Sequence, residues 1–457
     1  MKYHASMTAA LLSAITLVSC GKSQVSENSI SSDLRELAGG AGVIAAPSAR
    51  TAVYSGKFKP DLARAVSAAP DYRAAQSAVD EAVSGVEVAR SLRRPQVEMN
   101  GNIGALKEVG PTRTTTTEGA SATLYLRQVV YDGGESDANI GKAVATQLGA
   151  QARAMTEGNR IAREAGDAWI DLWQYEQRRQ LLTERAQKAR DILGQMQQLI
   201  ASGVIDKSAT TSAEIAMRNL ELEKVNLNAS HAEAQALFSI YFGKTPKSVN
   251  RPDLSFSQDE FARVAKDWAS VPALQAAAAR TIIARQDFEA AEARKKPTAG
   301  FRTGVNSPMS DTSSTDYVVG LEVRWILGDG GRRKADSEAK AARLEAEKSA
   351  LAALKLRSKA ELESALAKRA ALATSLETLR EQEQAATEES SILWSQLATG
   401  QTSMRQLVDA EINAYRSSDR LIAATAEAMK LDLEMGAQSG LLLRKLGMAT
   451  QTEGAAK

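Results

Sequence analysis

The sequence predicts a mainly α-helical chain with a small β part, in which one structural unit is used twice. A strand-like run leads into the turn Asp132-Gly133-Gly134, and the same order returns 197 residues later at Asp329-Gly330-Gly331. All ten prolines lie outside residues 112–245 and 309–457, which leaves room for very long helices in both copies. In short segments of each copy apolar and polar side chains alternate, and this two-residue period is typical of a β-strand. An internal repeat is stronger evidence for the fold than any local pattern. These observations therefore predict a duplicated long-helix hairpin, in which each copy carries a pair of strands.

The composition excludes several classes of function. The chain has 457 residues, 44% hydrophobic but only 5% aromatic, and its many alanines suit long helices packed through small side chains. A net charge of +2 gives no strong attraction for nucleic acid. The only cysteine is Cys20 and the only histidines are His4 and His231, so we expect no metal site, no cofactor and no enzymatic activity. After the N-terminal segment no apolar run is long enough for a helical membrane span.

The N-terminus predicts export and a lipid anchor. Residues 1–19 have the form of a signal peptide, with a positive end at Lys2 and an apolar stretch that is too short to span a bilayer. The segment that ends at Cys20 resembles a bacterial lipoprotein signal, which implies lipid attachment at Cys20, and Gly21 after it fits the outer membrane. An ordinary secretory signal with an incidental cysteine is the alternative. Residues 20–57 are rich in Ser, Gly and Ala and are expected to be a lipidated tether.

Each copy is predicted to contain two strands, a long helix and a return helix. The first repeat covers residues 58–243, with strands at about 97–106 and 120–130, a long helix at 134–201 and a return helix at 208–242. The second repeat covers residues 271–447, with strands at about 298–306 and 317–327, a long helix at 331–398 and a return helix at 403–439. A linker at 244–270 joins the copies, and residues 448–457 are expected to be a loose tail.

The strands have the length and pattern of membrane-spanning β-strands. About ten residues cross a bilayer when the strand is tilted in a barrel. Tyr317 and Trp325 stand near opposite ends of one apolar face, where membrane-interface aromatics are found. Strand edges must be closed in lipid, and four strands cannot close a barrel, so several copies of the chain would have to share one. A half-buried sheet in a soluble domain is the alternative.

The long helices predict a hollow column. A helix from 134 to 201 would be about 100 Å long at 1.5 Å per residue, more than a compact domain needs. Its faces mix arginine and glutamate with small residues, as expected of a tube that water touches on both sides. Ser202-Gly203 and Thr399-Gly400 end the two long helices, so each return helix runs antiparallel and makes a tip. Four glycines interrupt the first long helix where core residues would be expected: Gly141, Gly149, Gly158 and Gly166.

This duplicated order of elements resembles the TolC family of outer-membrane efflux and secretion channels over roughly residues 58–447. The segments that carry the resemblance are Val129 to Gly134 and the paired tips at 202–204 and 399–401. The resemblance implies a homotrimer in outer-membrane lipid. Four transmembrane β-strands per chain would complete a twelve-stranded β-barrel, joined at the Asp-Gly-Gly turns to an α-barrel that extends into the periplasm.

The resemblance also implies partners at the tips. A periplasmic adaptor (membrane fusion protein) would dock there and link the channel to an inner-membrane RND or ABC transporter. The tip residues that this assigns are Gly203, Val204, Gly400 and Gln401. Ser202, Thr399 and Gln401 depart from the docking motif of the family.

The resemblance further implies a channel constriction after the second tip, where the family carries two aspartates. Gln406 occupies the first of these positions and Asp409 the second, so only one acidic ring is expected. Mutual repulsion of three Asp409 side chains around a narrow axis would raise their pKa values. The alternative is that Asp409 is a solvated residue or a partner of Arg405 one turn earlier.

The sequence therefore predicts the outer-membrane channel component of a tripartite export system in a Gram-negative bacterium, which passively conducts small molecules from an inner-membrane pump to the exterior. The exit duct of a type I protein secretion system is an alternative, because this component does not choose the substrate. A non-pore periplasmic coiled-coil lipoprotein scaffold is an alternative from another class, and the four alternating strands argue against it.

Overall fold

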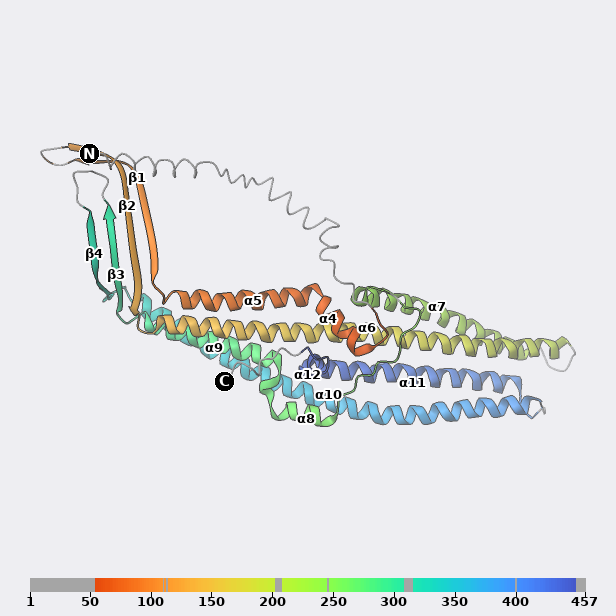
Figure 1. Cartoon of the computed structure of the whole chain (residues 1–457). Coiled ribbons are helices and arrows are strands. Elements are labelled where there is room, and N and C mark those ends of the chain that lie inside the picture. The colour runs from red at the N-terminus through yellow and green to blue at the C-terminus, as the bar shows by residue number, and fades with distance from the viewer. Residues whose placement is uncertain are drawn as a thin grey trace. The chain divides into compact units, whose positions relative to one another are not determined.

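The computed structural model describes residues 54–109, 111, 114–201, 208–244, 246–307, 315–398 and 401–448 (Figure 1). The first copy of the unit contains α4 (Phe58–Ala68), α5 (Pro70–Ser91), β1 (Gln96–Val109), β2 (Thr114–Tyr131), α6 (Glu135–Ala201) and α7 (Ser208–Phe242). The second contains α9 (Pro272–Ala293), β3 (Thr298–Ser307), β4 (Asp316–Arg324), α10 (Arg332–Ala398), α11 (Met404–Gln438) and α12 (Leu441–Lys445). Between the copies lie α8 (Gln258–Lys266) and the 3₁₀ helix η1 (Trp268–Ser270). The described residues are thus mainly helical with one small sheet, as predicted.

The two copies match in length as well as in order. α5 and α9 each have 22 residues, α6 and α10 each have 67, and α7 and α11 each have 35. α5 begins at Pro70 and α9 at Pro272, because proline at the first position of a helix lacks only an N–H that would have no partner there. Each residue of these helices therefore has a counterpart at the same position of the matching helix, although α5 and α9 start 202 residues apart, α6 and α10 197, and α7 and α11 196.

One antiparallel sheet contains all four strands in the order β1-β2-β3-β4. The pairs β1–β2 and β3–β4 lie within the copies, and the pair β2–β3 joins the two copies. β1 and β2 extend beyond the predicted 97–106 and 120–130, because Thr114 to Thr117, which we expected in a loop, are β-branched and pair with Val109 to Leu106. β4 ends at Arg324 rather than near 327, so Trp325 lies just beyond the strand.

α6 is the helix around which the others pack. It contacts α5 and α7 from its own copy and α9 and α11 from the other copy. The glycines that we expected to interrupt its core lie where these neighbours come closest. A Cβ atom at Gly158 would lie 2.9 Å from Cε2 of Tyr72 in α5, and one at Gly149 would lie 3.1 Å from Cβ of Ala279 in α9. The small residues therefore permit a close approach between helices.

A cluster of aromatic side chains forms the core where α4, α6 and α7 meet. Trp169 of α6 is fully buried, and its ring centroid lies 5.3 Å from those of Phe58 and Phe242 and 5.5 Å from that of Phe238. Its indole Nε1–H donates to the backbone carbonyl of Asn250 at 2.8 Å, which satisfies the polar atom of this buried ring. The cluster thus fixes the segment after α7 against the long helix.

The predicted tether over residues 20–57 is too long at its C-terminal end. The ring of Tyr54 lies 5.2 Å from that of Trp169, and the Tyr54 hydroxyl donates to the carbonyl of Ser248 at 3.2 Å. The backbone N–H of Ser55 donates to Oδ2 of Asp61 at 2.8 Å. An aromatic contact and a buried carboxylate therefore hold residues 54–57 against the helices. The rest of the tether, with Cys20, lies outside the described residues.

The predicted linker over 244–270 also carries structure. Ser257 caps α8 in a capping box with Glu260, and the neighbouring rings of Phe256 and Phe261 are buried. A Cβ atom at Gly436 of α11 would lie 2.4 Å from the Phe256 ring, so this glycine makes room for the aromatic side chain. None of the described helices has an apolar stretch that could cross a membrane.

Candidate functional site

The four-stranded sheet has one apolar face and one polar face. Leu124 of β2 pairs with Met99 of β1 and Val305 of β3, and Val305 pairs with Tyr317 of β4, so apolar positions line up across all four strands. The apolar face comprises Val97, Met99, Ile103, Ala122, Leu124, Leu126, Ala299, Phe301, Val305, Tyr317, Val319, Leu321 and Val323. The polar face carries Glu98, Asn100, Asn102, Tyr125, Arg127, Arg302, Asn306, Glu322 and Arg324.

The apolar face is exposed in the single chain. Tyr317 is 80% exposed, Val319 74% and Leu321 71%, and apolar residues of β1 are exposed to a similar degree. Trp325, which we expected at a membrane interface with Tyr317, is also exposed. A contiguous exposed apolar surface of this kind requires a protein or lipid to cover it.

The Asp-Gly-Gly turns that connect the sheet to the long helices are helix caps. Oδ2 of Asp132 accepts a hydrogen bond from the N–H of Ser136 at 2.8 Å, and Oδ1 accepts one from Gly134 at 3.1 Å. Gly133 and Gly134 have φ angles of 70° and 101°, and Gly330 and Gly331 have 66° and 87°, a conformation that glycine adopts without strain. In the second copy the N–H of Arg333 donates to the carboxylate of Asp329 at 3.2 Å.

The charge of Asp132 is stabilised in this cap. Burial acts to raise its pKa, but the hydrogen bonds from Ser136 and Gly134 and the charge of Arg93 outweigh burial and hold the pKa below its ordinary value. A carboxylate at the start of a helix also interacts favourably with the helix dipole. Asp132 therefore stays ionised and fixes the direction in which α6 leaves the sheet.

The two turns have different surroundings. A Cβ atom at Gly133 would lie 2.8 Å from the carbonyl oxygen of Ala293, and Nζ of Lys296 donates to the carbonyl of Gly133 at 3.1 Å. The first turn thus packs against the end of α9. A Cβ atom added at Gly330 or Gly331 would meet no described atom within 4 Å, apart from those of the glycine itself and its two neighbours in the chain. The second turn is open in the single chain.

The predicted tip residues Gly203, Val204 and Gly400 lie outside the described residues. Gln401 is exposed, and its N–H donates to the carbonyl of Gln396 at 3.0 Å. Next to the tips, an apolar cluster joins the long helix of the first copy to the return helix of the second. It contains Ile192, Met196, Met404, Leu407 and Val408.

The two predicted constriction residues lie in the first turns of α11 and have different roles. Gln406 completes a capping box: its N–H donates to Oγ of Ser403 at 3.3 Å, and the N–H of Ser403 donates to its Oε1 at 3.0 Å. Asp409 is exposed, and among the described residues no ion pair joins it to Arg405. The exposed face of α11 that contains Asp409 also carries Arg405, Gln406, Asn413, Arg416 and Arg420.

A seam of ion pairs between α6 and α11 was not predicted. Nε and Nη2 of Arg178 bind the two carboxylate oxygens of Asp419 at 2.6 and 2.9 Å. Nη1 of Arg185 binds Oε2 of Glu411 at 3.0 Å. Nζ of Lys430 lies 2.6 Å from Oδ1 of Asp171. The seven-residue spacing of Asp171, Arg178 and Arg185 was the available signal, because it puts all three on one side of α6.

Glu411 is the most buried carboxylate of this seam, with 4% exposure. Its Oε1 accepts hydrogen bonds from Oγ of Ser390 at 2.5 Å and Nε1 of Trp394 at 3.1 Å, both on α10. Burial acts to raise the pKa of Glu411, but Ser390 and Arg185 outweigh burial and lower the pKa. The charged form therefore links α6, α10 and α11.

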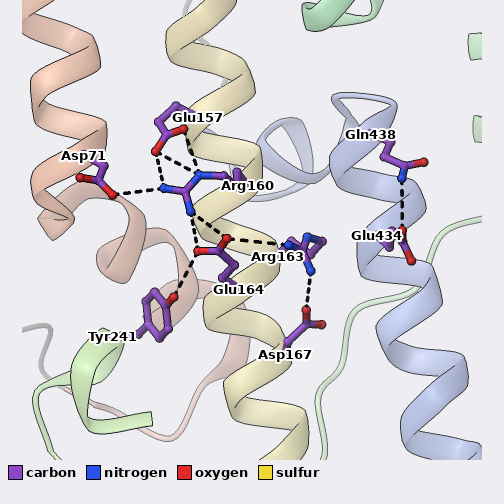
Figure 2. A network of polar contacts seen from close by, with 9 residues as sticks. All are labelled: Asp71, Glu157, Arg160, Arg163, Glu164, Asp167, Tyr241, Glu434 and Gln438. Atoms are coloured by element: carbon purple, nitrogen blue, oxygen red, sulfur yellow. Dashed lines mark hydrogen bonds and ion pairs between the residues drawn. The ribbon is translucent and has the colours of Figure 1, made fainter. Parts of the chain in front are cut away.

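A second polar network surrounds Arg160 of α6 (Figure 2). The Arg160 guanidinium binds Glu164 at 2.7 Å, Asp71 of α5 at 3.1 Å, and Glu157. The hydroxyl of Tyr241 from α7 donates to Glu164 at 3.2 Å. This network connects the helices α5, α6 and α7.

His231 and two tryptophans of α6 have structural partners. Trp169 is core, and the guanidinium of Arg251 lies over the ring of Trp173. Nη1 of Arg179 lies 2.9 Å from Nδ1 of His231; burial and then the charge of Arg179 lower the pKa of this imidazole. Among the described residues no group of three metal-binding side chains occurs.

Two stretches of the chain, residues 62–240 and 268–430, match the family model described as outer membrane efflux protein. The chain belongs to this family. The matched stretches fall on the two copies of the repeated unit. Outer membrane efflux proteins are channels of the Gram-negative outer membrane, so the family agrees with the predictions of an outer-membrane location and of no enzymatic activity.

Solved structures share the fold of this outer membrane efflux protein. The outer-membrane channel OprN is 16% identical with a TM-score of 0.74, over 84% of this chain and 90% of that one. The outer membrane protein VceC from Vibrio cholerae is 15% identical with a TM-score of 0.74, over 84% and 96% of the two chains. The MtrE outer membrane channel of Neisseria gonorrhoeae is 15% identical with a TM-score of 0.71, over 85% and 90%. No sequence among the curated proteins is significantly similar.

Proposed function

We propose that this outer membrane efflux protein is the channel component of a tripartite export system and passively conducts small molecules to the cell exterior. The observation that carries the proposal is the sheet, which has an exposed apolar face, a polar face and two unpaired edges, β1 and β4. An apolar outer face suits lipid, and a polar inner face suits a water-filled lumen. Both edges must pair with other strands if the sheet lies in a membrane.

The internal repeat supports a homotrimer. α9 packs between α6 and α10 and buries eight residues, whereas α5, its counterpart, buries only Tyr72 and Val86. If α5 of a neighbouring chain packed on α10 as α9 packs on α6, both copies would have equivalent surroundings. β1 of that neighbour would then pair with β4, and the open turn at Gly330 and Gly331 would be covered. Three chains would close a barrel of twelve strands.

The proposal places the partners at the tips. A periplasmic adaptor would bind the tip residues Gly203, Val204, Gly400 and Gln401 and connect the channel to an inner-membrane transporter. The chemistry of the described residues favours neither an RND nor an ABC transporter. Co-purification of the inner-membrane protein with this chain distinguishes the two.

Conductance across a planar bilayer tests the channel. Purified trimers are expected to give discrete current steps, and persistent silence from folded trimers would favour a scaffold without a pore. Asp409→Ala is expected to change the conductance and to reduce the preference for cations if Asp409 lines the entrance. Unchanged values would mean that Asp409 is an ordinary exposed residue. Asn413→Ala, on the same exposed face of α11 but uncharged, is the matched control.

We also propose that Cys20 is acylated and anchors the N-terminus in the outer membrane. About 0.8 kcal/mol per buried CH₂ makes several acyl chains a firm anchor. The intact mass of the mature protein is expected to include the acyl chains, and Cys20→Ser is expected to remove them. Equal acyl content in both proteins would refute the anchor without affecting the channel proposal.

A further inference from the structure

We propose that Arg127 and Arg302, which lie over Tyr125 on the polar face of the sheet, form a binding site for small oxyanions such as carboxylates and phosphates. The inference rests on the proposed channel for its location, because it takes the polar face as the wall of the lumen. To the proposed channel it adds a class of solute, small oxyanions, that the wall of the lumen would bind.

The two arginines are neighbours in the sheet. Arg127 of β2 and Arg302 of β3 are directly opposite in the strand register, and both side chains are exposed. Their guanidinium carbons lie 5.6 Å and 5.2 Å from the centre of the Tyr125 ring. Like charges that face each other across two strands repel one another. Their attraction to the face of the aromatic ring offsets part of this repulsion, and a bound anion would offset more.

The ring between the arginines is held in place. Tyr125 pairs with Gly304 of β3, where a Cβ atom would lie 2.8 Å from Cβ of Tyr125. The missing side chain therefore leaves room for the tyrosine beside β3. On its other side Tyr125 pairs with Glu98 of β1 in the strand register. The aromatic platform is thus fixed by residues of both neighbouring strands.

Both guanidinium groups are available to a ligand. Among the described residues neither Arg127 nor Arg302 forms an ion pair with a carboxylate, although Glu98 is near enough to act on Arg127 electrostatically. By contrast, Arg324 on the same face binds Glu322 at 3.1 Å. A planar guanidinium with free N–H groups binds carboxylate and phosphate oxygens in pairs.

A cavity of about 430 Å³ lies in front of the two arginines, between the polar face and the first turn of α6. This volume is within the range of small-molecule sites. Three carboxylates also line it, but each has a partner. Asp132 caps α6, Glu135 binds Arg294 at 2.7 Å, and Glu322 binds Arg324. The lining thus holds three arginines and three carboxylates, and Arg127 and Arg302 are the arginines of this lining that no described carboxylate binds.

Binding of inorganic phosphate to the full-length protein in detergent tests the site without requiring a pore. We expect the ³¹P NMR line of phosphate to broaden in the presence of the wild-type protein. R127Q/R302Q is expected to reduce the broadening at least tenfold, while R127K/R302K keeps part of it because the charges remain. E322Q/R324Q, which removes both partners of an ion pair on the same face and so leaves the net charge of the cavity unchanged, is the matched control and is expected to change the broadening less than threefold.

Ion selectivity tests whether the site lies in the conduit. In a potassium chloride gradient, R127Q/R302Q is expected to shift the reversal potential toward cation preference relative to the wild type. Size-exclusion chromatography checks assembly, and R302Q alone replaces the double variant if that variant does not assemble. If R127Q/R302Q loses phosphate binding but the wild-type protein gives no current, the result would support the anion site and refute the channel. Equal phosphate broadening by the wild type and R127Q/R302Q, or none by the wild type, would overturn the proposal.

Discussion

Asp167 of α6 is a mostly buried carboxylate whose pKa is raised to about 6. Burial is the main cause and the charges of Asp171 and Glu434 add to it, while Arg163 and Lys430 act in the opposite direction. The folded protein therefore holds the Asp167 proton more tightly than the unfolded chain does. Between the unfolded pKa of about 4 and the folded pKa of about 6, ionisation of this group lowers stability as the pH rises.

Asp167→Asn removes this ionisation and keeps a side-chain oxygen for Arg163, which binds Asp167 at 2.9 Å. At pH 4 we expect the variant and the wild type to have the same stability. At pH 7 the variant is expected to be more stable by up to about 3 kcal/mol, since each pKa unit corresponds to about 1.4 kcal/mol. Thermal unfolding in detergent at both pH values measures the difference. Asp191→Asn, at an exposed position of the same helix, is the control; an Asp167→Asn difference that does not grow with pH would contradict the account.

Local sequence patterns predicted some of the sites, but others depend on contacts that only the fold creates. The Asp132 and Asp329 turns could be predicted, because the left-handed glycines and the capping carboxylate are local and repeat in both copies. Gln406 was assigned to a constriction by its position alone, and its contacts within the chain are those of a capping residue. The capping box that Ser403 and Gln406 form was readable in the sequence, whereas the Tyr125 platform depends on strand register, which no local pattern specifies.

At the scale of elements, the ion pairs between α6 and α11 fix the register of two antiparallel helices that belong to different copies. The pair Arg185–Glu411 is buried, with side chains 11% and 4% exposed. Removing one partner of such a pair leaves a buried charge without compensation, whereas removing both avoids this. The ion pairs of this seam therefore fix how α6 and α11 align along their length, and they add little net stability.

Arg185→Ala is expected to destabilise the protein by about 3–5 kcal/mol, because Glu411 would remain charged and buried. The double variant R185Q/E411Q is expected to lose much less. Thermal unfolding of the three proteins in detergent makes the comparison. Lys359→Ala, which removes an exposed ion pair with Glu363, is the matched control and is expected to change stability by less than about 1 kcal/mol. Equal losses for R185A and K359A would contradict the role of the buried pair.

The helices and strands were largely predictable, because the pattern of each one continues over many residues without interruption. The Asp-Gly-Gly turns and the tip dipeptides Ser202-Gly203 and Thr399-Gly400 delimited the 67-residue helices, and alternation located the strands. The structure in 244–270 was missed because α8 is only nine residues long. Phe256, just before it, becomes informative only once it is seen to pack at Gly436 of α11. Tyr54 was missed for the same reason, since a single aromatic in a Ser/Gly/Ala-rich segment has no period.

At the scale of the whole molecule, the internal repeat specifies which residues of two chains should meet. Gly149 of α6 approaches Ala279 of α9 so closely that a Cβ atom added at Gly149 would lie 3.1 Å from Cβ of Ala279. The counterparts of these residues are Ala346 of α10 and Ser77 of α5, and both are exposed in the single chain. In the proposed trimer, Ala346 of one chain would approach Ser77 of the next.

Ser77→Cys combined with Ala346→Cys is therefore expected to form a disulfide between chains, since the geometry is close to that of natural disulfides. Under oxidising conditions, denaturing electrophoresis is expected to show covalent oligomers up to a trimer. Neither single variant should form them. Ser77→Cys with Ser375→Cys, at an exposed position much further along α10, is the control pair. Absence of any intermolecular product from the folded double variant would exclude the proposed packing.

The equal lengths of α6 and α10, and of α7 and α11, limit how such a chain can evolve. A deletion within α6 between Asp171 and Arg185 alone would put the residues after it out of register with their ion-pair partners on α11. Lineages of this protein can therefore gain or lose reach only when all four helices shorten or lengthen together.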